Sequence, residues 1–455
     1  MKAQTVSATE STLSSAELAE RTLYRRAVEA AIWGMPIVSV DAMRQAFIRD
    51  AGAKYNDIVY WSKPADWRFQ ITTPNASSYY VYFHINMKIG PVVLELPPAI
   101  GAGVFGSLLD AWQAPQADVG PAGDDQGRGG KYLLLPPGYK QTVPAEYIPV
   151  WFETYNGYSF LRVIPASSAY EDVAKALDFV KRIRLYPLAQ LINPPMQRHI
   201  DMAGKLFDGI VRFDESFYAS LARMVNEEPV LTHDLVALGQ LRSLGIEKQR
   251  EFKPQAATME ILQQAVIEAH ANLMQAVSVG ERFWPGRHWI IPGGGIGPKT
   301  GFSFQTAERL EIDERGMLFF LGCAPPKRLG AATFYVFGMH DAKDEPLQGS
   351  SSYRLRIPPN VPVKQFWAVT GYDLETAAFI HESPRIELNS YGQKVQKNMD
   401  GSIDVFFGAT PPAGREDNWI YTAPGRQWFS AFRFYGPEKA VFEKSWVLPD
   451  IEKVN

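Results

Sequence analysis

Thr333-Phe334-Tyr335-Val336-Phe337 belongs to a series of β-branched and aromatic stretches that decides the fold class of this chain. Residues of these types favour a pleated, half-buried surface, and turn residues separate one stretch from the next. The other stretches are residues 318–320, 353–357, 366–369, 403–407 and 429–435. Strands in this number predict a jelly-roll-like β-sandwich over residues 300–455.

Upstream of this region, residues 61–165 also have the pattern of a sheet. Short apolar runs such as Tyr79-Tyr80-Val81-Tyr82-Phe83 are separated there by glycine and proline. Short runs with this punctuation are typical of antiparallel strands joined by turns. We therefore expect a second, smaller β-sandwich in this part of the chain.

Helical patterns occupy the rest of the chain. Ser14 and Glu17 have the spacing of a helix start, which predicts an N-terminal helical segment within residues 1–60. Apolar residues at helical spacing predict a helical middle region over 166–299; the clearest stretches are 173–180, 202–221 and 259–277. The predicted fold class is thus mainly β with helical segments.

Composition narrows the function classes. The 455 residues exceed what one hydrophobic core usually supports, so two or more domains are expected. The 46 basic and 49 acidic residues leave a net charge of −3 without a basic block, so we expect no nucleic-acid partner. No stretch of 18 apolar residues is free of charge, and residues 1–15 contain no apolar leader. We therefore expect a cytoplasmic protein with no membrane partner.

Metal and cofactor signals are weak. Cys323 is the chain's only cysteine, which excludes an intrachain disulfide, and its apolar surroundings predict an inert core thiol. No two of the seven histidines have the spacing of a metal site. The prediction is a protein with neither metal nor cofactor.

Three groups of motifs resemble those of a known family. The first is Trp33-Gly34-Met35-Pro36. The second and densest consists of Thr73-Pro74-Asn75, the run 90–97, Asp110-Ala111-Trp112, Gly123-Asp124-Asp125, the run 129–133 and the run 136–139. The third consists of the run 366–373, Asp400-Gly401-Ser402 and Asn418-Trp419. In order and spacing they resemble the two-module family formed by domains of unknown function 1254 and 1214.

The resemblance implies an architecture but no reaction. It implies an N-terminal helix plus small β-sandwich, a helical middle region and a C-terminal jelly-roll-like domain, in agreement with the residue patterns. It also implies homo-oligomers. Since a fold does not determine an activity, function has to be inferred from particular residues.

The glycine-rich segment between Asp110 and Tyr132 is the first candidate for a catalytic site. Glycine at this density lets backbone approach a ligand closely. In the catalytic hypothesis, Asp110 or Asp125 acts as a base, and Lys131 or Tyr132 stabilises developing negative charge. The alternative is a surface hairpin whose glycines serve turns and whose aspartates accept bonds from backbone N–H groups.

Four further residues are candidates for substrate binding: Asn75, Trp112, Asn418 and Trp419. Amide side chains orient substrates, and a tryptophan ring provides contact area and an N–H donor. An Asx-turn explains Asn75 equally well, and Asn418-Trp419 equally fits a loop fixed to its own sandwich.

These observations lead to two functional hypotheses. The first is a hydrolase or lyase that acts on a small molecule in a cleft between the β modules. The second is a non-catalytic, homo-oligomeric binding or scaffold protein, which is favoured by the absence of any recognised catalytic signature.

Overall fold

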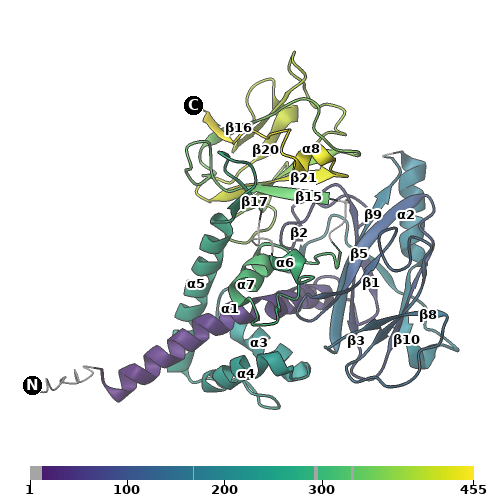
Figure 1. Ribbon diagram of the computed structural model, residues 1–455, viewed down its shortest axis with the longest axis vertical. Helices are drawn as coiled ribbons and strands as arrows, with labels where there is room; N and C mark the ends of the chain where they lie inside the picture. Colours follow the sequence, from purple (N-terminus) through teal and green to yellow (C-terminus); the bar gives the residue numbers. More distant parts are fainter. Residues whose placement is uncertain (1–12, 168, 292–295, 329–332, 455) are drawn as a thin grey trace, which may run out of the picture.

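Two β-sandwiches and a group of helices make up the structure (Figure 1). This computed structural model describes residues 13–167, 169–291, 296–328 and 333–454. In the part of the chain so described, no helix is long and apolar enough to cross a membrane. The predicted fold class, mainly β with helical segments, is confirmed. The domain boundaries after residues 60, 165 and 299 stay predictions.

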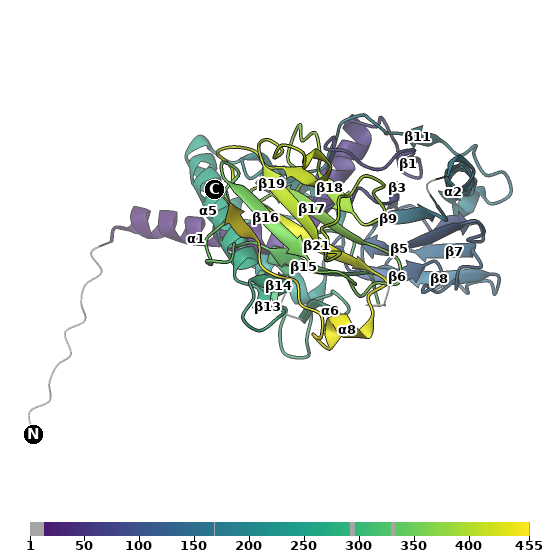
Figure 2. The same cartoon turned by 90° about the horizontal axis from the view of Figure 1, so that it is seen from above.

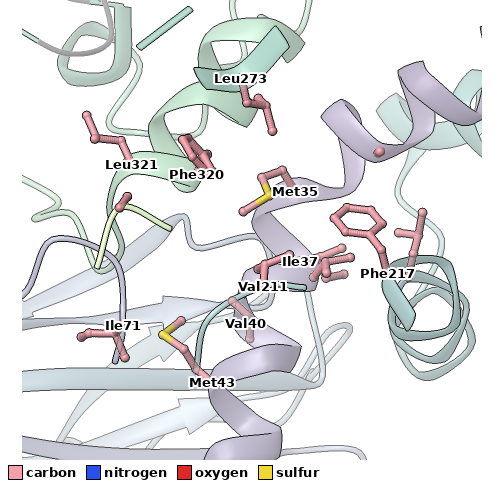
Figure 3. Close-up of a cluster of buried hydrophobic side chains, with 14 of the residues drawn as sticks. Met35, Ile37, Val40, Met43, Ile71, Val211, Phe217, Leu273, Phe320 and Leu321 are labelled. Carbon is pink, nitrogen blue, oxygen red and sulfur yellow. The ribbon is translucent and has the colours of Figure 1, made fainter. Parts of the chain in front are cut away.

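Helix α1 (Ser15–Arg49) forms the centre of the helical part. It begins as predicted: the side chains of Ser14 and Glu17 each bond the other's backbone N–H in a capping box. Its second half, from Ala27 onwards, is buried against α3, α5 and α7. Figure 3 shows Met35 and Ile37 of α1 among side chains that come from all three helices.

The motif Trp33-Gly34-Met35-Pro36 makes this packing possible. A Cβ at Gly34 would lie 2.8 Å from Leu221 Cδ1, so a larger residue there would displace this side chain of α3. Pro36 has no N–H, which frees the Ile32 carbonyl four residues earlier. A Cβ at Gly316 of α7 would lie 2.7 Å from this carbonyl oxygen, so a second glycine is needed there.

The other helices surround α1 or cap the sheets. They are α2 (Tyr170–Arg182), α3 (Ser216–Glu227), α4 (Leu235–Leu241), α5 (Ala256–Ser278), α6 (Ile296–Lys299), α7 (Ile312–Leu321) and α8 (Lys439–Phe442), with 3₁₀ turns η1 (Leu188–Gln190), η2 (Thr232–Asp234), η3 (Arg242–Leu244) and η4 (Glu416–Asn418). The predicted helices over 173–180 and 259–277 are confirmed.

Two predicted elements are wrong. The helix predicted over 202–221 begins only at Ser216, because residues 207–208 pair as a strand with residues 69–70. The strand predicted over 318–320 lies within α7, whose Phe320 and Leu321 pack in the core around α1 (Figure 3). A short apolar run does not distinguish a buried helix from a strand.

The N-terminal sandwich consists of a six-stranded sheet, β11-β1-β3-β9-β5-β6, and a four-stranded sheet, β10-β4-β7-β8. The strands are β1 (Ile58–Tyr60), β3 (Tyr79–Asn86), β4 (Val92–Leu96), β5 (Ala102–Asp110), β6 (Pro115–Val119), β7 (Gly130–Leu135), β8 (Tyr147–Trp151), β9 (Asn156–Pro165), β10 (Arg184–Pro187) and β11 (His199–Asp201), beside the separate pair β2 (Phe69–Gln70) and β12 (Phe207–Asp208). Val81 and Leu161 face the sandwich interior. Because side chains alternate along a strand, Tyr80, Tyr82 and Phe160 face outwards, into the core around α1.

The C-terminal sandwich has the same plan: a six-stranded sheet, β13-β14-β15-β21-β17-β18, and a four-stranded sheet, β20-β19-β16-β22. The strands are β13 (Glu281–Arg282), β14 (Trp289–Ile291), β15 (Thr333–Gly338), β16 (Ser352–Ile357), β17 (Trp367–Asp373), β18 (Glu387–Asn389), β19 (Ile403–Gly408), β20 (Trp419–Tyr421), β21 (Trp428–Tyr435) and β22 (Glu452–Val454). Phe432 and Phe434 of β21 face the sandwich interior, whereas Phe429 and Ala431 join the core around α1.

The two six-stranded sheets are joined through Arg433 of β21. Its guanidinium donates to the carbonyl oxygens of Thr73 (3.0 Å) and Pro74 (3.4 Å) in the N-terminal module. It also donates to Thr370 Oγ1 (2.8 Å) and to the Tyr372 hydroxyl (2.6 Å) in the C-terminal module. We call these contacts the Arg433 clamp. Arg433 is 2% exposed, so the clamp lies in the interior.

Two further contacts strengthen this junction. Glu387 of β18 accepts from the Ala76 backbone N–H (3.1 Å) and from the Ser77 hydroxyl. The Gln70 amide donates to the Phe379 carbonyl at 3.1 Å. The loop after β2 is therefore held against the C-terminal sheet from several sides.

We expect Arg433→Met to lower the free energy of unfolding by roughly 2–4 kcal/mol, because it leaves two carbonyls and two hydroxyls of the clamp without their donor. Arg356→Met is the control. Arg356 pairs with Asp400 at the surface, and its side chain is 46% exposed. The control should change stability by less than about 1 kcal/mol. Urea unfolding measures both variants, and equally small effects would show that the clamp does not join the modules.

Candidate functional site

A second arginine, the half-buried Arg162, lies where the outer faces of the two six-stranded sheets meet. It is on β9, the strand between β3 and β5, and its cross-strand neighbours are Tyr80 and Phe105. The guanidinium carbon lies 5.7 Å from the centre of the Tyr80 ring and 5.9 Å from that of Phe105. Arg162 is thus set among aromatic rings.

The charge of Arg162 is not neutralised by a neighbouring carboxylate. Among the described residues, no Asp or Glu oxygen comes within the 4.0 Å of an ion pair with its guanidinium. Its Nε is buried without a hydrogen-bond partner. Arginine is always protonated in proteins, and burying an unpaired charge is costly. This arrangement is therefore expensive unless something else occupies the site.

Arg162 and two nearby side chains, Cys323 and Tyr335, are only partly buried. Arg162 and Cys323 are both only half-buried and retain part of their accessible surface. Tyr335 of β15, opposite Arg433 in the sheet, is likewise only half-buried. Each of these three side chains is therefore partly accessible to solvent.

Hydroxyl groups without partners lie in the same region. The hydroxyls of Tyr82 and Tyr435 are buried and make no hydrogen bond to any described residue. Tyr82 lies close enough to Cys323, and Tyr435 close enough to Tyr335, for their charged forms to interact. Native proteins rarely leave buried polar groups unpaired, and such groups often mark functional sites. One unpaired hydroxyl thus comes from each module, and neither is accessible to solvent.

Burial also sets the protonation state of the site. It raises the pKa of the Cys323 thiol to about 11, even though the charge of Arg162 acts in the opposite direction. It raises the pKa of Tyr80, Tyr82 and Tyr435 above the usual phenol value. At neutral pH the site thus contains one cation, a neutral thiol and neutral phenols.

The segment that carries Cys323 is held by the glycine-rich part of the N-terminal module. Both oxygens of Asp118 accept backbone N–H groups, from Lys327 (2.7 Å) and Arg328 (2.9 Å). Arg328 also donates to Asp124 Oδ1 at 2.9 Å. At the other end, the Ala324 N–H donates to the Tyr158 hydroxyl (3.2 Å). The segment therefore crosses the site between two fixed ends.

The structure places the predicted catalytic residues elsewhere. Asp125 accepts from the Gly120 N–H (2.7 Å), the Gly129 N–H (3.2 Å) and the Tyr132 hydroxyl (3.0 Å), so these groups organise the hairpin itself. Lys131 faces the opposite side of β7, where it pairs with Glu95 at 3.6 Å. Tyr132 and Lys131 therefore lie on opposite sides of β7, and the catalytic roles of Asp125, Lys131 and Tyr132 stay predictions.

Asp110 is at the far end of β5 from Phe105, roughly 16 Å from it along the strand. Its Oδ1 accepts the backbone N–H groups of Trp112 (2.8 Å) and Ala114 (2.9 Å). Burial raises its pKa to about 7, a value suited to a general base, but its oxygens already have internal partners.

Trp112 packs edge-on against Trp33, with ring centres 4.8 Å apart.

The other predicted binding residues also have internal partners. Asn75 Oδ1 accepts the N–H groups of Ser77 and Ser78, both at 3.0 Å, in the Asx-turn given as its alternative. Asn418 is fully buried and bonds both backbone groups of Gln396 at 2.8 Å. The Trp419 Nε1–H donates to the Gly408 carbonyl at 2.9 Å. Asn418 and Trp419 thus secure the second sheet of the C-terminal sandwich. Binding roles for these residues stay predictions.

Sequence analysis missed Arg162, although one signal was present. In the run Tyr158-Ser159-Phe160-Leu161-Arg162-Val163, a charge interrupts an apolar strand at a position that shares a face with Tyr158 and Phe160. A charged residue on a buried face suggests a function, but identifying the buried face requires the partner sheet.

Other sites are less suited to a ligand. A surface hollow of about 400 Å³ is lined by Tyr55, Asn86 and Glu227 among others. Glu227 is already paired there with the buried Arg44. Within the described ranges, no group of three or more His, Cys, Asp or Glu side chains could hold a metal ion.

We expect Cys323 to react with iodoacetamide about 100-fold more slowly in the folded protein than in the urea-unfolded chain at pH 8, because a thiol with a pKa of about 11 is almost entirely protonated there. The rate should rise about tenfold per pH unit up to pH 10. Mass spectrometry reads the reaction directly, since the chain has one cysteine. A rate that levels off below pH 9 would contradict the raised pKa.

We expect stability to fall as pH rises from 4 towards 7, because folded Asp110 holds its proton up to a pKa of about 7 whereas the unfolded carboxyl ionises near 4. Asp110→Asn removes this penalty. Between pH 4.5 and 7.5, urea unfolding should shift in favour of the variant by roughly 2–4 kcal/mol relative to the natural chain. A difference that does not depend on pH would refute the assignment.

Comparison with known proteins places the chain in a family. The family model "Protein of unknown function (DUF1254)" matches residues 55–187, and "Protein of unknown function (DUF1214)" matches residues 332–439. Among curated proteins there is no significant match.

Two solved structures are similar. The VPA0106 protein from Vibrio parahaemolyticus is 17% identical with a TM-score of 0.54, and the match covers 95% of this chain and 100% of that one. A putative uncharacterized protein from Burkholderia cenocepacia is 12% identical with a TM-score of 0.41, over 95% and 94% of the two chains. The first likeness supports the fold alone. With both modules matched in the order that the motifs indicate, the chain belongs to the two-module DUF1254/DUF1214 family.

Proposed function

We propose that this protein binds a small organic anion between its two β modules, with Arg162 as the anchor. The observation that carries the proposal is the half-buried guanidinium, which has no carboxylate partner among the described residues and whose Nε makes no hydrogen bond to them. A bound carboxylate would accept two parallel hydrogen bonds from arginine and neutralise its charge. The free energy lost by burying Arg162 in the empty protein is then recovered on binding.

The position of the site supports binding at the module junction. Tyr80, Phe105 and Arg162 come from the N-terminal sheet, and Tyr335 and Tyr435 from the C-terminal sheet. A ligand at Arg162 touches both modules, as expected for small-molecule sites, which often lie between domains. This agrees with the cleft predicted between the β modules, but with other residues lining it.

A lyase reaction is the second candidate, favoured by the unpaired hydroxyls of Tyr82 and Tyr435. A neutral phenol beside a cation is suited to donate a proton to a leaving group. Hydrolysis through Cys323 is disfavoured, because a thiol with a pKa of about 11 provides almost no thiolate nucleophile at neutral pH. A panel of esters, amides and carboxylic acids tests for turnover, and activity that survives Tyr435→Phe and Tyr82→Phe would remove the tyrosines from the chemistry.

We expect Arg162→Met to have two opposite effects. Without ligand it should raise the free energy of unfolding by about 1 kcal/mol, because it removes a half-buried charge that has no carboxylate partner among the described residues. With sodium benzoate it should abolish the stabilisation seen in the natural chain, which reaches about 2.7 kcal/mol at 100 times the dissociation constant. Functional sites commonly trade stability for activity in this way.

Arg182→Gln provides the control for loss of one positive charge. Arg182 is on α2, and its side chain is 48% exposed beside Asp178. This variant should keep both the stability of the empty protein and its stabilisation by benzoate. If Arg162→Met instead destabilises the empty protein and keeps the response to benzoate, Arg162 has a structural role and the proposal fails.

A further inference from the structure

The segment that carries Cys323 is an irregular connection held by few contacts. It comprises residues 322–328, which we call the strap, and these residues form neither helix nor strand. The strap begins at the end of α7, where the Gly322 N–H donates to the Leu318 carbonyl at 2.8 Å. From Pro326 onwards it is exposed. A segment without a ladder of backbone bonds opens easily, so its few anchors decide whether it stays closed.

Two prolines divide the strap. Pro325 and Pro326 have no backbone N–H, so the middle of the strap has no donor. Before them, the Ala324 N–H donates to the Tyr158 hydroxyl at 3.2 Å. After them, both backbone N–H groups donate to one side chain, Asp118. The exposed half of the strap is therefore fixed through a single carboxylate.

The other contacts of this half lie at the surface. Arg328 pairs with Asp124 at 2.9 Å, but its side chain is 62% exposed, and ion pairs of this kind contribute little. The Lys327 ammonium donates to the Gln116 carbonyl, also in an exposed position. Asp118 is only 7% exposed, so its bonds to the two N–H groups are shielded from water. Asp118 is thus the main anchor.

The closed strap contains a strained residue. Ala324 has a φ of +52°, in the left-handed region that residues with a Cβ rarely adopt. It also precedes Pro325, and the residue before a proline prefers extended backbone. Opening the strap would let Ala324 relax, so this strain acts against the anchor.

The anchors place the strap across the outer face of the N-terminal six-stranded sheet. Tyr158, which holds Ala324, is on β9, and Asp118 is on β6, with β5 between the two strands. Arg162 shares the outer face of β9 with Tyr158, and it is close enough to Cys323 for its charge to act on the thiol. Opening the strap therefore uncovers Arg162 and Cys323 together.

From these observations we infer that the strap opens locally when Asp118 releases it, and that this opening is the entrance to Arg162. The inference rests on the proposed function, because a ligand of Arg162 is what needs an entrance. Release of the two N–H groups frees the exposed half of the strap, which turns about its α7 end. Because Cys323 is on the strap, the reactivity of its thiol reports the opening.

Alkylation of Cys323 by iodoacetamide in the full chain measures the opening. Asp118→Ala removes both bonds of the anchor and should raise the rate at pH 8 about tenfold over that of the natural chain. In this variant the rate should level off above about pH 9, because a thiol in water has a pKa of about 8.5. Asp118→Asn keeps one acceptor oxygen and should raise the rate about threefold.

Two controls separate local opening from unfolding. Asp341→Ala removes a matched anchor in the C-terminal module, since Asp341 is 2% exposed and accepts the N–H groups of Lys343 (2.8 Å) and Glu345 (3.2 Å). This variant should alkylate at the rate of the natural chain. For Asp118→Ala, about 1 M urea should change the rate by less than about twofold, whereas reaction through global unfolding would accelerate at least about tenfold.

Stopped-flow binding of sodium benzoate tests the entrance itself. Asp118→Asn should raise the association and dissociation rate constants by the same factor, about threefold, and leave the dissociation constant unchanged. The inference is overturned if Asp118→Ala does not accelerate alkylation, if the acceleration depends on urea, or if benzoate binds with unchanged rate constants. If benzoate does not bind the natural chain at all, the proposed function fails, and the entrance with it.

Discussion

The Arg433 clamp is the contact on which the arrangement of the two modules depends. One guanidinium donates to two carbonyls of the N-terminal module and to two hydroxyls of the C-terminal module. Five directional donors in one rigid plane make arginine suited to such a junction. Because the clamp holds the outer faces of the two six-stranded sheets together, it encloses Arg162 between them. Without the clamp, Arg162 would lie on an open sheet face in water, and its charge would carry no desolvation penalty.

The two arginines of this interface, Arg433 and Arg162, thus have opposite roles. Arg433 has its donors satisfied and stabilises the junction, whereas Arg162 has no carboxylate partner among the described residues and its Nε is unpaired there, which weakens the junction. A protein tolerates a destabilising group where that group has a function. The stability of the surrounding structure then offsets the free-energy cost. The extensive contacts of the loop after β2, which bonds Arg433, Glu387 and Phe379, provide that stability. The glycine-rich segment contributes indirectly, since Asp118 and Asp124 hold the segment that carries Cys323.

Much of the architecture could be predicted from the sequence, because it follows from local patterns. The capping box at Ser14, the α5 helix and the strands of both sandwiches have the periodicity and turn residues that specify them. The prediction failed where tertiary pairing overrode the local pattern: residues 207–208 form a strand only because β2 lies beside them. The strand predicted over 318–320 failed because a three-residue apolar run fits either kind of element.

The candidate site was harder to predict than the fold. Glycine, aspartate and lysine at high density between Asp110 and Tyr132 suggested a pocket, yet the same residues are those of a hairpin, and Asp125 bonds its own turn. Arg162 stands alone in its strand, and its importance depends on the absence of a nearby carboxylate. That absence is a property of the whole interface. Tyr335 and Tyr435, which belong to it, lie on two paired strands more than 170 residues after Arg162 in the sequence.

The most direct test of the central claim is a crystal structure of the protein soaked with 4-bromobenzoate, read from the anomalous scattering of bromine. We predict one bromine peak between β9 and β21, with the carboxylate bonded to the Arg162 guanidinium and the ring among Tyr80, Phe105 and Tyr335. A structure in which bromine binds elsewhere, while the Arg162 guanidinium is paired with a carboxylate of the chain itself, would contradict the claim.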